Sequence, residues 1–149
     1  MAQKISFETT LLVRDACLCL HVQRAARAMA RRFDEALRPL ELTNGQFSLM
    51  VSLNRPKPAG MSAVAALLAT DRTTLTAALK PLERRGLVDI LVDAEDRRSR
   101  LLVLTAQGRS LLAAAVPIWE RTHAAVERSL DKPGPDRLRR DLQALSRLA

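Results

Sequence analysis

The sequence predicts a mainly α-helical fold with a small β-hairpin, on three observations. Apolar residues recur at steps of three and four over most of the chain, which is the period of an amphipathic helix. Two short apolar runs, residues 87–92 and 100–104, flank a polar segment and indicate a pair of strands. A length of 149 residues, 48% hydrophobic and 27% charged, suits one domain with its own core and excludes a disordered chain.

The first predicted element is one long helix over residues 8–38. Arginines interrupt its single apolar stripe, which comprises Leu12, Ala16, Cys19, Ala26, Met29, Ala30, Phe33 and Leu37. A helix this long in a small domain often packs along a partner rather than against its own chain. Cys17 and Cys19 stand two positions apart on this helix, so we expect them to point to nearly opposite sides and not to pair.

Two short helices are expected next. Thr43 is the expected N-cap of a helix over residues 44–53. Residues 54–60 contain two prolines and a glycine, which indicates a loop. Ser62 is the expected N-cap of a second short helix over residues 63–69.

A third helix is expected over residues 72–85, capped by Asp71 and ended by Gly86. Its apolar face is formed by Leu75, Leu79 and Leu82. Pro81 interrupts the pattern, and a proline inside a helix costs about 3 kcal/mol or bends it, so we expect a kink or an early loosening there.

The strands at residues 87–92 and 100–104 are joined by a turn over residues 93–99. Thr105 is expected to cap the following helix, which reaches about residue 130 and bends at Pro117. After a break at residues 132–135, a last helix is expected over residues 136–148. Its apolar stripe is Leu138, Leu142, Leu145 and Leu148.

The charge of the chain favours an anionic partner. Lysine and arginine number 24 against 16 acidic residues, and the net charge is +8. A basic excess of this size indicates nucleic acid first and a membrane surface second, whereas the alternative is a solvated, arginine-rich surface. Aromatic residues are 3% of the chain and tyrosine is absent, which argues against a single-strand binder built on stacked aromatic rings.

Metal, cofactor and enzyme functions find no support in the sequence. Cys17 and Cys19 are too few for a disulfide scaffold, and His21 and His123 add no metal-ligand spacing. No set of nucleophile, base and orienting residue is recognisable. The N-terminal segment lacks the features of a signal peptide and no apolar run is long enough to cross a bilayer, so we expect a cytoplasmic protein.

The order of elements over residues 43–104 predicts a winged helix-turn-helix, in which two helices precede a two-stranded hairpin. The second helix of such a unit enters the major groove of double-stranded DNA and reads base edges. Its candidate contact residues are Arg72, Thr73, Thr74, Thr76 and Lys80. A winged helix that binds protein instead would need an apolar or acidic face, and these cations oppose that alternative.

The turn of the hairpin carries more positive charge than a turn requires. Arginine is preferred where the DNA minor groove is narrow and its potential is negative. We therefore expect Arg98 to enter the minor groove, and Arg97 and Arg100 to lie beside phosphates. Asp96 is expected to brace either an arginine or the backbone of the turn.

Three stretches resemble the multiple-antibiotic-resistance regulator (MarR) family. Residues 96–108, DRRSRLLVLTAQG, resemble its signature through Asp96, Arg98, Leu104, Thr105 and Gly108. The stretch DRTTLTAALKPLERRGLV resembles the recognition helix running into the wing, and LTNGQFSLM resembles the helix before it. The resemblance covers nearly the whole chain, with its elements in the right order.

The resemblance implies a homodimer, assembled through helices within residues 8–40 and 105–149, with residues 43–104 binding DNA. It implies a repressor that binds a pseudo-palindromic operator and is released by a small, often aromatic, effector. The pocket for such an effector would lie between the dimer body and the winged domain. Its candidate lining residues are Cys19, Phe47, Met50, Met61 and Trp119.

A branch of the family senses organic hydroperoxides through a cysteine near the start of the first helix, and Cys19 lies at about that position. Those sensors hold the cysteine with tyrosines, which this chain lacks. Burial on the apolar stripe is expected to keep Cys19 inert. We therefore expect a small, mainly apolar anion such as a carboxylate to act as effector, with redox sensing by Cys19 as the alternative.

Overall fold

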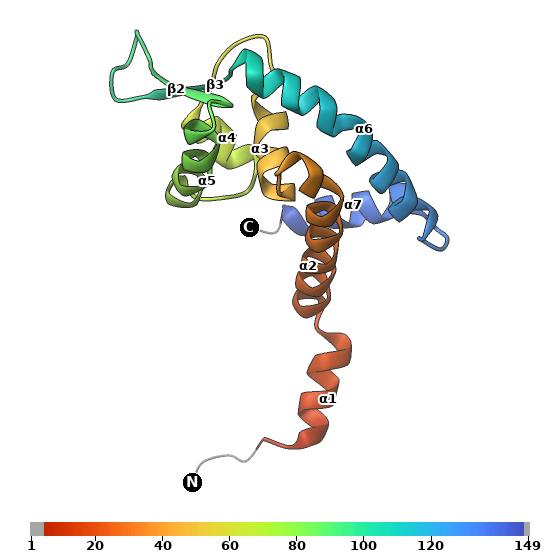
Figure 1. The fold of residues 1–149 in the computed structure, drawn as a ribbon. Coiled ribbons are helices and arrows are strands. Elements are labelled where there is room, and N and C mark those ends of the chain that lie inside the picture. The colour runs from red at the N-terminus through yellow and green to blue at the C-terminus, as the bar shows by residue number, and fades with distance from the viewer. Residues whose placement is uncertain (1–4, 148–149) are drawn as a thin grey trace.

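A computed structural model describes residues 5–147 and confirms a mainly helical fold with a small antiparallel sheet (Figure 1). Leu148, which was expected in the last helix, lies outside the described residues. Residues 1–4, the start of the N-terminal segment in which no signal peptide was expected, also lie outside them. The N-terminal elements are α1 (Phe7–Ala16), α2 (Leu18–Leu37), the 3₁₀ turn η1 (Arg38–Leu40) and α3 (Asn44–Leu53). The central elements are β1 (Ala59–Gly60), α4 (Met61–Leu67), α5 (Arg72–Arg84), β2 (Val88–Val92) and β3 (Arg100–Leu104). The last elements are α6 (Ala106–Arg128) and α7 (Pro135–Ser146).

The expectation of one helix over residues 8–38 is wrong, because the helix breaks at Cys17. Cys17 has extended backbone angles, φ −72° and ψ 107°, and its sulfur accepts a hydrogen bond from the amide of Leu20 at 3.5 Å. Cys17 thus caps α2 in place of a continuing turn. No proline or glycine marks this position, and the apolar periodicity continues on both sides of it. The sequence pattern therefore does not reveal the break.

The helix-turn-helix core begins as expected at Thr43. Its hydroxyl accepts from the amide of Gln46 at 3.1 Å, and the side chain of Gln46 accepts from the amide of Thr43 at 3.0 Å. This capping box satisfies two of the free amide groups at the start of α3. Pro81 lies inside α5 without ending it, since α5 continues to Arg84.

A third strand corrects the loop that was expected over residues 54–60. Ala59 and Gly60 pair antiparallel with Leu102 and Leu101, so the sheet has the order β1-β3-β2. A two-residue strand is too short to show a periodic pattern in the sequence. The expected cap Ser62 is also wrong, because this strand leads directly into α4 and Gly60 occupies the N-cap.

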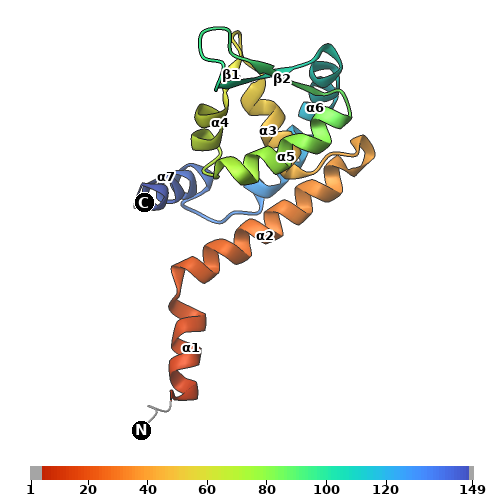
Figure 2. The same cartoon turned by 90° about the vertical axis from the view of Figure 1, so that its left-hand side faces the viewer.

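The core lies between α3, α5, α6 and the sheet. Its most deeply buried side chains come from all these regions and from the end of α2, and include Leu37, Met50, Leu75, Leu79, Leu82 and Leu102. The apolar face of α5 expected from the sequence is therefore the buried face. Its opposite face is left to solvent, as Figure 2 shows.

The hairpin is held to α5 and α6 by contacts at the connection between α5 and β2. Gly86 has a φ of +67°, which favours glycine, and ends α5. The hydroxyl of Thr105 donates to the carbonyl of Gly86 at 2.6 Å, and the amide of Thr105 donates to the carbonyl of Leu87 at 3.1 Å. A Cβ on Gly108 would lie 2.1 Å from the oxygen of Leu87, so only glycine allows α6 to approach this closely.

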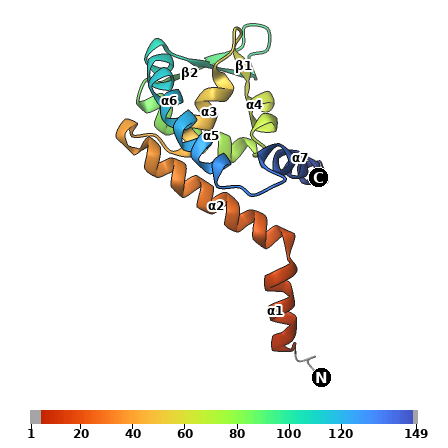
Figure 3. The ribbon, with the colours of Figure 1, turned by 90° about the vertical axis from the view of Figure 1, so that its right-hand side faces the viewer.

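Apolar side chains remain exposed at both ends of the chain. Helix α1 extends away from the helical body and buries none of its residues, whereas α7 turns back from the end of α6 (Figure 3). The exposed apolar residues of α1, α2 and α7 are Phe7, Leu12, Val13, Leu18, Val22, Met29, Leu138, Leu142 and Leu145. These are the two regions that the sequence predicted to pack along a partner.

Candidate nucleic-acid interface

The outward face of α5 brings together most of the predicted reading residues. Arg72, Thr73, Thr76 and Lys80 line one shallow depression of about 320 Å³, together with Ala77. All five residues are exposed on the side of α5 opposite its buried leucines. This face offers hydroxyl, methyl and cationic groups to a ligand that lies along the helix.

The threonines of α5 differ in which hydroxyls are free. Asp71 caps the helix, accepting from the amide of Thr74 at 2.7 Å and from its hydroxyl at 2.8 Å, and these bonds lower the pKa of the Asp71 carboxyl. The hydroxyl of Thr76 donates to the carbonyl of Arg72 at 2.7 Å. Within residues 5–147, the hydroxyl of Thr73 makes no hydrogen bond, so its donor is available to a ligand.

Asp96 braces the backbone of the wing turn, which decides between the two roles expected for it. Its carboxylate accepts from the amide of Arg98 at 3.0 Å and from the hydroxyl of Ser99 at 2.9 Å. The bond from the Arg98 amide, then that from Ser99, lowers the pKa of this carboxyl. The guanidinium of Arg100 donates to the carbonyl of Arg97 at 3.0 Å and so also ties the turn.

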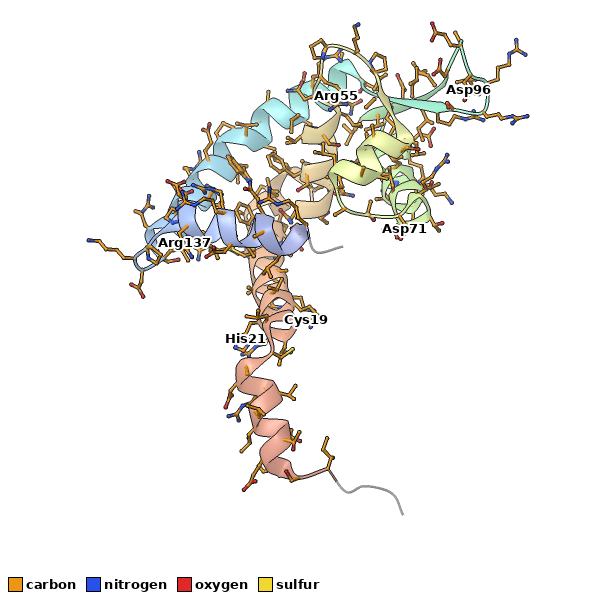
Figure 4. The ribbon with its side chains drawn as sticks, turned by 180° about the vertical axis from the view of Figure 1, so that it is seen from behind. Cys19, His21, Arg55, Asp71, Asp96 and Arg137 are labelled. Carbon is orange, nitrogen blue, oxygen red and sulfur yellow. The ribbon has the colours of Figure 1, made fainter. Side chains whose placement is uncertain are left out.

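A cleft of about 460 Å³ separates the wing from the start of α4 and α5. Its charged lining comprises Arg72 from α5, Arg98 and Arg100 from the wing, and the acids Asp93 and Asp96. Figure 4 shows Asp96 on the wing and Asp71 at the head of α5, on the same side of the molecule. Asp96 is engaged with backbone and hydroxyl donors, and Arg100 with carbonyl groups of the turn. Within the described residues, the guanidinium groups of Arg72 and Arg98 make no hydrogen bond and are the cations of this cleft that a ligand can reach.

The MarR family model matches residues 42–99 of the chain. The transcriptional regulator HosA of Escherichia coli O157:H7 is 38% identical over 81 residues, which are 54% of this chain and 59% of HosA. The organic hydroperoxide resistance transcriptional regulator of Bacillus subtilis is 31% identical and matches 68% of this chain and 69% of its own. This chain belongs to the MarR family.

Structural comparison agrees with this membership. The M. tuberculosis transcriptional regulator MosR, whose crystal structure is a complex with DNA, is 39% identical. The match covers 89% of this MarR-family chain and 95% of the MosR chain, with a TM-score of 0.81. The likeness therefore extends beyond the winged region to the helices on either side of it.

The five residues expected to line an effector pocket of this MarR-family chain do not share one environment. Phe47 and Met50 are buried in the core, and the rings of Phe47 and Trp119 stack with their centroids 6.2 Å apart. Met61 instead lines the cleft beside the wing. Cys19 is exposed on α2, apart from the α3–α6 contact (Figure 4).

The expected burial of Cys19 is wrong. The first half of α2 projects beyond the core, so the stripe that contains Cys19 is buried only at its other end, at Phe33 and Leu37. The sulfur of Cys19 accepts from the side-chain amide of Gln23 at 3.2 Å. The break at Cys17 also removes the continuous helix from which opposite orientations of the two thiols were inferred.

Sequence reasoning missed a stack that extends from α3 along α6. The ring of Trp119 lies against His123 with centroids 4.7 Å apart, and His123 Nδ1 lies 3.7 Å from Glu127 Oε1. Arg139 of α7 donates to Glu127 at 2.5 Å and thereby joins α7 to α6. The spacing of Trp119, His123 and Glu127 by four residues was the available signal, because such residues share one helix face.

Residues 5–147 hold no group of three or more histidine, cysteine or acidic side chains placed to bind a metal ion. Within the same residues, no helix combines the length and the apolar character that crossing a lipid bilayer demands.

The bracing role of Asp96 predicts that Asp96→Ala increases hydrogen exchange at the amides of Arg98 and Ser99. Glu95→Gln is the matched control, since the Glu95 side chain makes no hydrogen bond within the described residues. The folded pKa of Asp96 is lowered, so its stabilisation is present above the unfolded value of about 3.9 and is lost as pH falls through the folded value. Equal exchange in both variants, measured by NMR over this acid range, would contradict the brace.

Proposed function

We propose that this protein is a sequence-specific, DNA-binding transcription regulator that acts as a homodimeric repressor in the cytoplasm. The observation that carries the proposal is the cationic surface formed jointly by α5 and the wing. Membership of the MarR family and the likeness to MosR, which was crystallised with DNA, support it. The match to HosA spans 59% of that protein.

In this proposal, α5 lies in the major groove and the wing reaches the minor groove. Thr73, with its free hydroxyl, and the methyl groups of the neighbouring threonines contact base edges, whereas Arg72 and Lys80 neutralise phosphates. Arg98 extends from a turn that Asp96 and Arg100 hold in shape, so the inserted side chain is presented on a preformed loop. The cleft between α5 and the wing is the path for one sugar–phosphate strand.

The dimer is proposed to form through helices within residues 8–40 and 105–149, leaving residues 43–104 to bind DNA. The exposed apolar residues of α1, α2 and α7 support this assignment, because a monomer would leave them in water. Two copies related by a two-fold axis present two α5 helices to a pseudo-palindrome, with half-sites about one DNA turn apart.

A small aromatic carboxylate is the proposed effector. The half-buried rings of Trp119 and His123 offer a flat surface beside α3, and Arg24, Arg27 and Arg31 line a depression of about 300 Å³ on α2. An organic hydroperoxide that oxidises the Cys19 thiol is the second candidate. It is favoured by the exposure of Cys19 and by the likeness to the Bacillus subtilis organic hydroperoxide resistance regulator.

The wing assignment is tested on a duplex selected from random sequences. Arg98→Ala is expected to weaken binding by about 1–3 kcal/mol without altering fold or assembly, because the side chain is exposed. Arg97→Ala acts more weakly and reduces the salt slope of the affinity by about one unit. Arg121→Ala, an exposed arginine of α6, is the control. If the wild type selects no duplex but binds protein, the protein-interaction alternative replaces this function. If the Arg97/Arg98 double variant binds DNA with unchanged affinity, the wing does not contact DNA as proposed.

The dimer is tested by replacing Leu138 and Leu142 with aspartate. Charge in a seam that the dimer buries is expected to yield monomers in sedimentation experiments and to lower affinity for a two-half-site duplex more than tenfold, an order-of-magnitude estimate. Leu67→Asp is the control for sedimentation, since Leu67 is also an exposed leucine but lies on α4, outside the helices of the proposed interface. A double variant that sediments as a dimer would place the interface elsewhere.

The effector is tested by titrating the protein–operator complex with benzoate and with cumene hydroperoxide, for wild type and Cys19→Ser. We expect benzoate to release both proteins equally, since the carboxylate does not require the thiol. Release of the wild type by micromolar hydroperoxide, lost in Cys19→Ser and reversed by added thiol, would instead identify Cys19 as the sensor.

A further inference from the structure

Arg85 joins the end of α5 to a distant part of the chain. It is half-buried and is the first residue after the helix. Its guanidinium donates through Nη1 to the carbonyl of Glu41 at 2.6 Å and through Nη2 to the carbonyl of Leu40 at 3.3 Å. Both acceptors belong to residues 38–43, which connect α2 to α3.

The two carbonyl groups are available because of an unusual backbone turn. Residues 38–40 form the turn η1, and Glu41 then adopts a left-handed conformation, φ 53° and ψ 38°. This conformation costs a residue with a side chain about 1–2 kcal/mol, so neighbouring contacts must hold it. Hydrogen bonds from a charged guanidinium are among the stronger ones available for this purpose.

The contact couples the direction of α5 to that of α2. Within residues 5–147, the hydrogen bonds of Arg85 are the only ones between α5 or its cap and residues 38–43. The carboxylate of Asp34 on α2 accepts from the amide of Asn44 at 2.6 Å, so the start of α3 is tied to α2 as well. The connection is therefore held to α2 on one side and to α5 on the other.

We propose that Arg85 is a positioning residue that sets the angle between α5 and α2, and thereby the half-site spacing that the dimer accepts. The inference rests on the proposed function, because α2 belongs to the dimer body and α5 to the DNA-reading surface. Arg85 acts without touching DNA, since both of its terminal nitrogens are engaged with protein carbonyls.

Arg84 provides a matched control. It precedes Arg85 directly and carries the same charge, but it is exposed and makes no hydrogen bond or ion pair within the described residues. A loss caused by charge alone should therefore appear in Arg84→Gln as well as in Arg85→Gln. A loss caused by the contact should appear only in Arg85→Gln.

The experiment measures affinity for duplexes whose two half-sites, selected with the wild type, are separated by spacers varied one base pair at a time. The wild type and Arg84→Gln are expected to prefer one spacer. Arg85→Gln is expected to lose about tenfold in affinity at that spacer and little at its neighbours, which flattens the profile, with the salt slope unchanged. Arg85→Lys, which keeps the charge and can reach one carbonyl, is expected to lie between them.

Hydrogen exchange supplies a readout that needs no DNA. The amide of Glu41 donates to the carbonyl of Arg38 at 2.8 Å, and exchange at Glu41 is expected to rise in Arg85→Gln but not in Arg84→Gln. If Arg85→Gln does not fold, Arg85→Lys is used for both measurements, and an unaltered spacer profile in it overturns the proposal.

A spacer profile of Arg85→Gln that matches the wild type would overturn the positioning role. A salt slope lower by about one unit in Arg85→Gln would overturn it too, because it would show that Arg85 contacts a phosphate. If the wild type binds no duplex, the proposed function fails and the spacing role fails with it. The exchange at Glu41 would then still report whether Arg85 holds the connection, so the two failures are distinguishable.

Discussion

The carbonyl groups of Gly86 and Leu87 anchor the part of the chain that we propose to bind DNA. Both accept hydrogen bonds from Thr105, and the missing side chain of Gly108 lets α6 lie against the oxygen of Leu87. The end of α5, the root of the hairpin and the start of α6 therefore meet at one point. A shift of α6 that keeps these bonds moves α5 and the wing together.

Acidic residues shape a surface whose net character is cationic. Asp71 starts α5 and Asp96 shapes the wing turn, and each carboxylate is engaged by an amide and a hydroxyl. The two carboxylates fix the backbone from which the neighbouring arginines project, and they form no ion pairs with those arginines within the described residues. Because amide and hydroxyl donors satisfy these carboxylates, the guanidinium groups of Arg72 and Arg98 are not drawn into ion pairs with them and stay available to a ligand.

The sequence was sufficient for elements whose signals are local. The caps at Thr43, Asp71 and Thr105 and the hairpin follow from side chains that bond within three residues or alternate along a strand. The break at Cys17 could not be read, because a cysteine sulfur acting as a helix cap leaves no compositional mark. Strand β1 and the contact of Arg85 depend on partners more than 40 positions away along the chain, and one sequence carries no information on such pairings.

Helix α1 has a consequence for how the chain acquires its final shape. It holds ten residues, none of them buried, and it joins α2 through the extended backbone of Cys17. An isolated helix shorter than about 12–15 residues is only marginally stable in water. In the proposed homodimer, contacts with the second subunit stabilise α1 as a helix, so the folding of α1 depends on protein concentration. Dilution would then unfold α1 before it disturbs the winged core, and the helix content of the protein would report how much of it is dimeric.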